Sequence, residues 1–204
     1  MKILHVVGAR PNFVKVAPVM RALRKYSQVE QILLHTGQHY DAEMSDAFFH
    51  DLAIPEPEIN LGVGSGTHAQ QTAKIMDRIE PVLIGAKPDR VLVYGDVNST
   101  VAAALVCAKL LISVAHIEAG LRSFDRSMPE EINRILTDHI ADLHFTPSHD
   151  ASENLLKEGI DKGMVQLVGN VMIDSLVNVL PFAETAWKSQ KKQIGTDKFG
   201  LVTL

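Results

Sequence analysis

The chain has 204 residues, of which 46% are hydrophobic and 22% are charged, and its 24 acidic and 20 basic residues give a formal net charge of −4. This composition is that of a globular protein long enough for one well-packed domain and part of another. The acidic balance, the lack of a basic block and an aromatic content of only 5% argue against nucleic-acid binding. A small anionic ligand remains compatible with it, because a local cluster of arginine and lysine can hold one inside an acidic protein.

Cysteine content and hydropathy indicate a cytoplasmic protein. The only cysteine, Cys107, excludes an internal disulfide, fits a reducing compartment and lies in an apolar run typical of a core position. The apolar run at residues 2–7 is too short for the core of a signal peptide. The longest apolar tract, at 101–115, is broken by Lys109 and is shorter than a membrane span. We therefore expect no membrane association.

Strand and helix patterns alternate along almost the whole chain. In chain order, we predict a strand at 2–7, a helix at 12–25, a strand at 32–35, a helix at 43–52, a brief strand at 58–61, a helix at 67–86, a strand at 90–94, a helix at 100–111, a strand at 113–117, a helix at 129–140, a strand at 143–146, a helix at 148–158, a strand at 165–168 and a helix at 172–186. Short apolar strands separated by helices are typical of a parallel sheet covered on both faces. The predicted fold class is α/β, with a doubly wound parallel sheet.

Local signals mark the ends of some of these helices. Thr67 is followed three residues later by Gln70, which predicts a capping box at the start of a helix. Ser127 and Glu130 predict a second one. Pro81 lies inside a predicted helix and should kink or split it.

The last residues of the sequence differ from the rest. Residues 189–198 are polar and resemble a linker, and residues 199–204, FGLVTL, read as the first strand of another unit. This pattern indicates a truncated protein whose second domain is missing. An edge strand on the first sheet is the alternative.

The loop after the first strand, GARPNFVK, is a candidate anion site. Ligands of open parallel sheets bind at the carboxyl ends of the strands. Arg10 and Phe13 stand where a dinucleotide fingerprint needs glycines, and no acidic residue closes the second strand, so a nicotinamide-dependent dehydrogenase is disfavoured. Arg10 at a helix N-terminus, with Lys15 one turn further on, would suit phosphate or sugar oxygens. The alternative for Lys15 is an exposed position on a solvated helix face.

Three acidic residues follow the later strands. Each of these acids also has a structural explanation. Asp96 could form an Asx turn, and Glu130 could belong to the capping box with Ser127. Glu118 could accept hydrogen bonds from backbone N–H groups of its turn or pair with Arg122. Glu131 can likewise form a helical ion pair with Arg134. Topology instead predicts that the three acids converge on one crevice beside the arginines Arg10, Arg122 and Arg134. Acids that share a cleft raise one another's pKa, which suits proton transfer. A hard metal ion is the rival use, but no compact ligand spacing supports it and we predict no metal.

Five motifs carry a family resemblance. GARPNFVKVAPV, TGQHYD, GDVNST, HIEAGLRS and PEEINR occur in the order and spacing of the non-hydrolysing UDP-N-acetylglucosamine 2-epimerases, and the resemblance runs from Met1 to Leu204. It implies two Rossmann-like domains in the glycosyltransferase-B arrangement, with the active site between them. This sequence would supply the N-terminal half: a domain at 1–170, a connecting helix and linker at 171–198, and at 199–204 the first strand of a truncated C-terminal nucleotide-binding domain.

The resemblance also implies a reaction and its residues. Members interconvert UDP-N-acetylglucosamine and UDP-N-acetylmannosamine by elimination and re-addition of UDP through a glycal, without a cofactor, in cell-surface polysaccharide biosynthesis, and dimers are their habit. By motif position, the residues fall into three sets: catalytic Asp96, Glu118 and Glu130; substrate-binding Arg10, Lys15, His116, Arg122 and Arg134; and Gln38, His39 and Glu131 of a regulatory nucleotide-sugar site found in some bacterial members. His116 is also expected to help position the loop that carries Glu118.

Two alternatives to this function remain open. A hydrolysing relative would release UDP and free N-acetylmannosamine, and the first-domain motifs of the two enzymes overlap. An isolated domain that binds or oligomerises without catalysis belongs to a different class of protein.

Overall fold

The computed structural model describes residues 1–38, 52–195 and 200, and within these ranges the chain forms a seven-stranded, all-parallel sheet. The strands are β1 (Lys2–Val7), β2 (Glu30–His35), β3 (Ile59–Asn60), β4 (Arg90–Tyr94), β5 (Ser113–Ile117), β6 (Leu143–Thr146) and β7 (Val165–Leu167). Their order in the sheet is β3-β2-β1-β4-β5-β6-β7, so the chain starts in the middle, runs to one edge and returns to continue beyond β1. This is the predicted doubly wound topology, and its switch point lies between β1 and β4.

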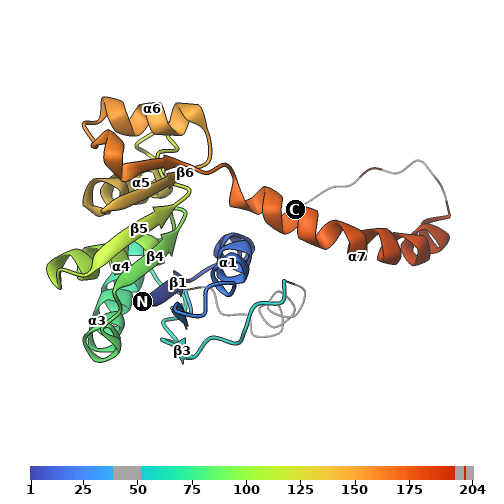
Figure 1. Cartoon of the computed structure of the whole chain (residues 1–204), viewed down its shortest axis with the longest axis horizontal. Coiled ribbons are helices and arrows are strands. Elements are labelled where there is room, and N and C mark those ends of the chain that lie inside the picture. Colours follow the sequence, from blue (N-terminus) through green and yellow to red (C-terminus); the bar gives the residue numbers. More distant parts are fainter. Residues whose placement is uncertain (39–51, 196–199, 201–204) are drawn as a thin grey trace.

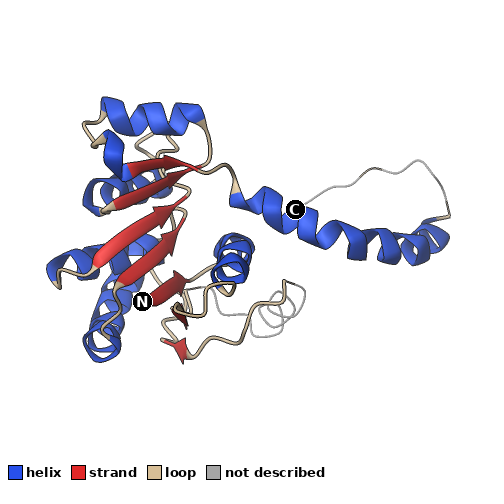
Figure 2. Cartoon of the chain, viewed as in Figure 1, coloured by secondary structure: helices blue, strands red, loops and turns tan. Residues whose placement is uncertain are grey.

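Helices cover both faces of the sheet (Figures 1 and 2). They are α1 (Arg10–Leu23), α3 (His68–Ala86), α4 (Asn98–Lys109), α5 (Pro129–Ile140), α6 (His149–Lys157) and α7 (Val171–Ile194), with a 3₁₀ turn at Lys162–Met164. Alternate residues of β1 point to opposite faces: Ile3 and Val7 pack in one core cluster with α1, and Leu4 and Val6 pack in another with α3 and α4. Both faces of the strand are therefore buried, as its continuous apolar run predicts.

Two predicted elements fall almost entirely outside the residues that the structure describes. The predicted helix at 43–52 lies outside the described residues except at its last position. The predicted strand at 199–204 lies outside them except at Gly200.

The helix signals in the sequence have mixed outcomes. Thr67 caps α3 as predicted, because its hydroxyl accepts a hydrogen bond from the N–H of Gln70. Of the two outcomes predicted for Pro81, a kink or a split, the split is wrong: α3 is one helix to Ala86, and buried side chains on both sides of the proline anchor it to the core. The second capping box is also wrong, since the hydroxyl of Ser127 donates to Asp125 and Met128 occupies the N-cap position of α5.

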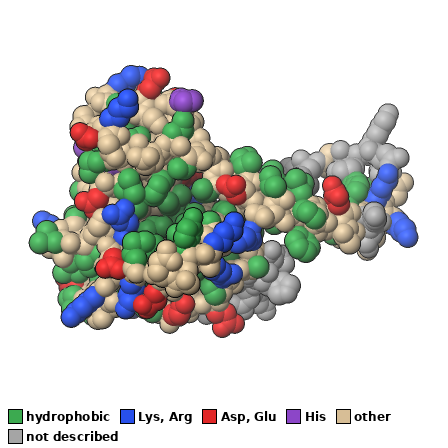
Figure 3. Space-filling view, in the orientation of Figure 1, with side chains coloured by type: hydrophobic (Ala, Val, Ile, Leu, Met, Phe, Trp, Pro, Cys, Tyr) green, Lys and Arg blue, Asp and Glu red, His purple; other side chains and the backbone are tan. Residues whose placement is uncertain are grey.

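The last helix is longer than the sequence indicates. α7 ends at Ile194, so residues 189–194, predicted as linker, are helical. It projects away from the sheet (Figure 1) and carries hydrophobic side chains along its exposed surface (Figure 3). These residues are 46% to 73% exposed: Ile173, Leu176, Val177, Leu180 and Phe182. In residues 1–38 and 52–195, no helix combines the length and hydropathy that crossing a membrane requires.

A buried histidine in β1 makes the stability of the fold depend on pH. His5 is fully buried, with Nδ1 2.7 Å from the hydroxyl oxygen of Tyr94 and Nε2 3.1 Å from Oε1 of Gln31. Burial lowers the pKa of His5 to about 4, although the hydrogen bond to Gln31 opposes this shift. The unfolded chain takes up this proton near pH 6.5, so between about pH 6.5 and 4 it binds more protons than the folded chain.

We therefore predict that acidification from pH 7 to pH 5 lowers the free energy of unfolding by about 2 kcal/mol through His5. Urea titrations at both pH values measure the loss. The variant His5→Gln is the control, because glutamine stays neutral and keeps a donor and an acceptor. Its loss of stability should be smaller than that of the unsubstituted chain, and an equal loss would contradict the assignment.

Candidate functional site

The ends of β1 and β4 are joined by one buried side chain, Asn12. Its Oδ1 accepts hydrogen bonds from the N–H groups of Gly8, at 2.9 Å, and Ala9, at 3.1 Å. Its Nδ2 donates to the carbonyl oxygen of Tyr94, at 2.8 Å. Because α1 begins at Arg10, these bonds fix the first turn of that helix against the exit of β4. Asn12 belongs to the GARPN motif but was not predicted as a site residue.

The ends of β2 and α4 are joined in the same way. Oε1 of Gln38 accepts from the N–H and the hydroxyl of Ser99, at 3.0 and 2.7 Å, and the Ser99 hydroxyl lies 2.8 Å from that of Thr36. Gln38 is buried, and its side-chain oxygen is occupied within the chain. His39, which was predicted to act with it in a regulatory site, lies outside the described residues.

Glu118 lies directly after β5 and forms an ion pair with Lys15 of α1. Both side chains are mostly buried. The structural explanations for Glu118, a pair with Arg122 or bonds to backbone N–H groups of its turn, are therefore wrong, and so is the solvated position for Lys15. The pair rests against Gly95, which has a φ of +63°: a Cβ atom there would lie 2.7 Å from Nζ of Lys15 and 3.2 Å from Oε2 of Glu118. Only glycine leaves this space open without backbone strain.

Asp96 follows β4 and forms an ion pair with Arg134 of α5. Its Oδ2 lies 2.5 Å from Nη2 of Arg134, and the amide of Asn133 donates to its carbonyl oxygen at 2.9 Å. The Asx-turn explanation is wrong, since Val97 is the N-cap of α4 and gives it no side-chain cap. Both neighbours of Asp96 come from α5, so this helix fixes the residue from the side opposite α1.

The two glutamates of PEEINR have different environments. Glu131 is buried and accepts from the N–H groups of Ser123 and Phe124, each at 3.0 Å. Burial raises its pKa, but these bonds and the charge of Arg134, 3.3 Å away, outweigh burial and hold the pKa below its usual value. The predicted helical pair with Arg134 is confirmed. Glu130 is half-buried and makes no hydrogen bond or ion pair with any described residue. Its carboxylate is thus available to a ligand, whereas that of Glu131 is occupied.

Glu130 borders a pocket of about 300 Å³ that is rich in amide side chains. The pocket is lined by Gln38, Ser65, Gly66, His68, Gln71, Val97, Asn98, Glu130 and Asn133. Several of these side chains bond to one another; the amide of Asn98 donates to Oε1 of Gln71 at 2.8 Å, for example. The pocket therefore has a fixed polar wall beside the turn that carries Asp96.

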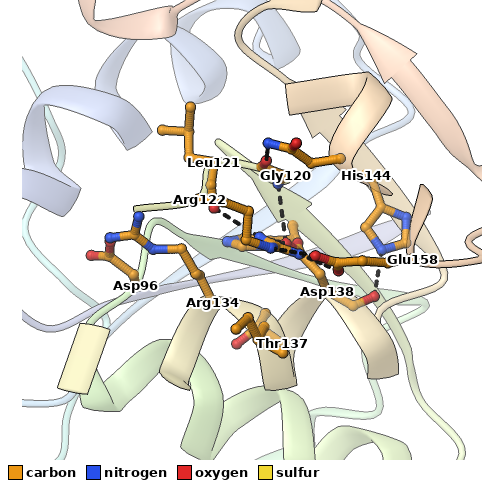
Figure 4. A network of polar contacts seen from close by, with 12 residues as sticks. Asp96, Gly120, Leu121, Arg122, Arg134, Thr137, Asp138, His144 and Glu158 are labelled. Atoms are coloured by element: carbon orange, nitrogen blue, oxygen red, sulfur yellow. Dashed lines mark hydrogen bonds and ion pairs between the residues drawn. The ribbon is translucent and has the colours of Figure 1, made fainter. Parts of the chain in front are cut away.

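Arg122 points to Asp138, a carboxylate that the sequence did not single out (Figure 4), and His116 contacts the same carboxylate. Nη1 of Arg122 lies 2.7 Å from Oδ2 of Asp138, and Nδ1 of His116 lies 2.6 Å from Oδ1. Arg122 also holds Glu158 through two nitrogens, each at 2.7 Å. Burial lowers the pKa of Arg122, but Glu158 and Asp138 outweigh it and raise the pKa above its usual value. The expected convergence of Arg122 on Glu118 is wrong. A signal for Asp138 existed, namely a charged residue on the buried face of α5.

Arg10 differs from the other predicted cations. It is exposed at the start of α1 and makes no hydrogen bond or ion pair within the described part of the chain. Arg10 and Lys15 were predicted to form one anion site together. Lys15 instead pairs with Glu118, which leaves Arg10 as the cation of that loop without an ion pair among the described residues. Among the described residues there is also no group of three or more His, Cys, Asp or Glu side chains placed to hold a metal ion.

The chain matches a known family over most of its length. The model of the UDP-N-acetylglucosamine 2-epimerase family matches residues 21–204. A UDP-N-acetylglucosamine 2-epimerase homolog of Methanococcus maripaludis is 56% identical over 184 residues, which is 90% of this chain and 51% of the relative. A UDP-2,3-diacetamido-2,3-dideoxy-D-glucuronate 2-epimerase of Pseudomonas aeruginosa is 50% identical over 188 residues, which is 91% of this chain and 52% of the relative.

Solved structures agree. The crystal structure of the UDP-GlcNAc 2-epimerase of Methanocaldococcus jannaschii, in complex with UDP-GlcNAc and UDP, superposes with a TM-score of 0.88 at 49% identity over 90% of this chain and 51% of that one. The chain thus spans about half the length of the relatives it matches. Its sheet corresponds to half of a glycosyltransferase-B type fold, and the chain belongs to the UDP-N-acetylglucosamine 2-epimerase family.

Proposed function

We propose that this chain is the first half of an enzyme that interconverts UDP-N-acetylglucosamine and UDP-N-acetylmannosamine. The observation that carries the proposal is the arrangement at the exits of β4 and β5. There Asp96 and Glu118 each pair with a cation from a different helix, and Glu130 has no such partner beside an adjoining pocket. Three carboxylates in different surroundings are suited to different protonation roles.

The reaction that these groups would serve is an elimination followed by re-addition. UDP leaves C1 of the sugar as the C2 proton is lost, which gives a glycal, and UDP then adds back with protonation of C2 from the other face. We assign proton transfer at C2 to Asp96, Glu118 and Glu130, and contact with the departing diphosphate to Arg10. Proton loss and gain are balanced and no electrons are transferred to another molecule, so the reaction itself calls for no redox cofactor.

The chain spans about half the length of its relatives, which supports an active site built from two domains. We propose that residues 1–170 form the first domain, that 171–198 connect it to a second, and that 199–204 begin the second domain, whose residues would complete the nucleotide site. The chain by itself is then inactive. The resemblance further leads us to propose a cytoplasmic homodimer that serves cell-surface polysaccharide synthesis.

Three alternative functions compete with this proposal. The Pseudomonas aeruginosa relative is as similar to this chain as many family members, which favours a UDP-2,3-diacetamido-2,3-dideoxy-D-glucuronate as a second candidate substrate. A hydrolysing enzyme would release UDP and free N-acetylmannosamine. A binding or oligomerising domain would do neither.

The full-length polypeptide that contains this chain provides the test. Incubation with UDP-N-acetylglucosamine in deuterium oxide should place deuterium at C2 and produce UDP-N-acetylmannosamine, both visible by NMR. Free N-acetylmannosamine would instead identify the hydrolysing enzyme, and exchange only with the diacetamido glucuronate would identify the second substrate. The absence of exchange with either nucleotide sugar would contradict the proposal.

In the full-length enzyme, we predict that Glu118→Gln and Asp96→Asn each lower kcat by about 10²–10⁴-fold, the usual contribution of a positioned acid or base. Each substitution keeps the size of the side chain and removes its ability to exchange a proton at neutral pH. Circular dichroism checks that the fold is intact. Turnover equal to that of the unsubstituted enzyme in either variant would refute the role of that residue.

The contact between Gly95 and the Lys15–Glu118 pair gives a second prediction. Gly95→Ala should displace the pair and lower kcat/KM by about 10-fold or more, since small misplacements of reacting groups are costly. Gly62→Ala is the matched control, because Gly62 has a φ of +58° and a Cβ there would meet only Arg78, at 3.9 Å. Both variants bear similar backbone strain, so Gly62→Ala reports the effect of that strain alone, and urea titrations should show at least as large a loss of stability for Gly95→Ala. Equal activities would show that the contact at Gly95 has no influence on Glu118.

A further inference from the structure

We propose that His116 is a buried imidazolium cation that positions the peptide between Gly95 and Asp96, and that Asp138 is the residue that keeps it charged. The proposal rests on the proposed function, because it assigns positioning roles for the acids of that site. Neither residue is assigned a contact with the substrate.

The protonation of His116 follows from its partners. Nδ1 lies 2.6 Å from the Asp138 carboxylate, and Nε2 lies 2.8 Å from the carbonyl oxygen of Gly95. Carboxylate and carbonyl oxygens only accept hydrogen bonds, so each ring nitrogen must carry a hydrogen for both contacts to be hydrogen bonds. The side chain is fully buried, and water has no access to replace either partner.

Asp138 is suited to hold this cation because three donors face it. Besides His116, its Oδ2 accepts from Nη1 of Arg122 at 2.7 Å and from the N–H of Gly120 at 3.1 Å. Burial raises the pKa of Asp138, but the charges and hydrogen bonds of His116 and Arg122 outweigh it, and the pKa lies below its usual value. Arg122 and the N–H of Gly120 donate to Oδ2 independently of His116, so Asp138 is an anion and not a neutral acid that donates to Nδ1.

The charges alternate along the group. His116 is followed by Asp138, then Arg122, then Glu158, so each buried charge lies beside one of opposite sign. An isolated buried imidazolium would be strongly disfavoured, and this arrangement with satisfied hydrogen bonds is the kind that stabilises one. The group links β5, the turn after β5, α5 and the C-cap of α6, which carry His116, Arg122, Asp138 and Glu158 in that order.

The group acts on both acidic turns of the site. The N–H of Gly95 donates to the carbonyl oxygen of Ile117 at 3.0 Å, and its own carbonyl accepts from His116. That carbonyl belongs to the peptide that leads into Asp96, so its orientation is fixed from β5. Asp138 also bonds on both sides of Glu118, through His116 two residues before it and through Gly120 two residues after it. One carboxylate thus fixes the backbone that carries both acids.

Another buried histidine shows that burial by itself does not produce this state. His5 is equally buried, but one of its partners is the hydroxyl of Tyr94, which can donate to a neutral ring. The pKa of His5 is accordingly low, about 4. His5 and His116 are thus equally buried but differ in their partners, since only His116 has a carboxylate and a carbonyl oxygen at its two ring nitrogens.

The protonation state can be measured on the chain itself. In ¹⁵N-labelled chain at pH 7 to 8, we expect NMR to show both ring nitrogens of His116 protonated, with the neutral His5 as internal reference. In Asp138→Asn, one ring nitrogen of His116 should lose its hydrogen. An unprotonated ring nitrogen of His116 in the unsubstituted chain would overturn the proposal, and this measurement does not require Asp138→Asn to fold.

The positioning role is measured in the full-length enzyme. We expect Asp138→Asn to lower kcat by about 10–100-fold, the usual effect of losing a supporting partner of a reacting group, with little change in KM. Asp142→Asn is the matched control, since the Asp142 carboxylate accepts from the N–H of Val114, 2.7 Å away, at the opposite end of β5. A kcat for Asp138→Asn equal to that of Asp142→Asn would overturn the positioning role.

The two proposals fail in different ways. An inactive unsubstituted enzyme counts against the proposed function, and the NMR result then decides the state of His116. An active enzyme in which Asp138→Asn matches the control counts only against the positioning role.

Discussion

The parallel pairing of β1, β4 and β5 is the constraint on which the rest of the structure depends. β4 pairs with β1 on one side and with β5 on the other, and Tyr94 at the end of β4 stands opposite Ile117 at the end of β5. Parallel strands end at the same edge of a sheet, so the chain leaves all three at neighbouring points. Gly8, Asp96 and Glu118 follow from this register, and no contact between side chains is needed to bring them together.

Cations from different helices then fix the acids at that edge. Lys15 comes from α1 and Arg134 from α5, and each meets a carboxylate from a strand exit that lies far away in sequence. A further cation is held in the same way behind these acids, because Arg122 lies between the carboxylates of Asp138 and Glu158. Helices on both faces of the sheet are thus connected through the site, which makes the positions of the acids depend on the packing of the whole domain.

The sequence predicts the strands and helices around this site better than the contacts between its side chains. Short continuous apolar runs predicted the strands, because a strand that is buried on both faces needs apolar residues at successive positions. The cap at Thr67 was also predictable, since both of its partners are within three residues. The two carboxylates that bind Arg122 were not predictable, because Asp138 and Glu158 become neighbours only when α5 and α6 pack. At Ser127 a nearer acceptor, Asp125, displaces the expected cap. Local rules therefore succeeded where no other side chain, near or distant in sequence, competes for the same group.

Glu118 has a backbone conformation that an unbranched acid adopts only at a cost. Its φ is +74°, in the left-handed region that disfavours residues with a Cβ atom by roughly 1–2 kcal/mol. Glycine would relieve this backbone strain and keep the hydrogen bonds of residues 118 and 119 to the carbonyl of Phe145, but it would leave the buried Lys15 without its partner. Requirements for a stable backbone and for a carboxylate beside Lys15 thus oppose each other at one residue. The backbone strain at position 118 is therefore retained together with the ion pair, and relief of the one requires loss of the other.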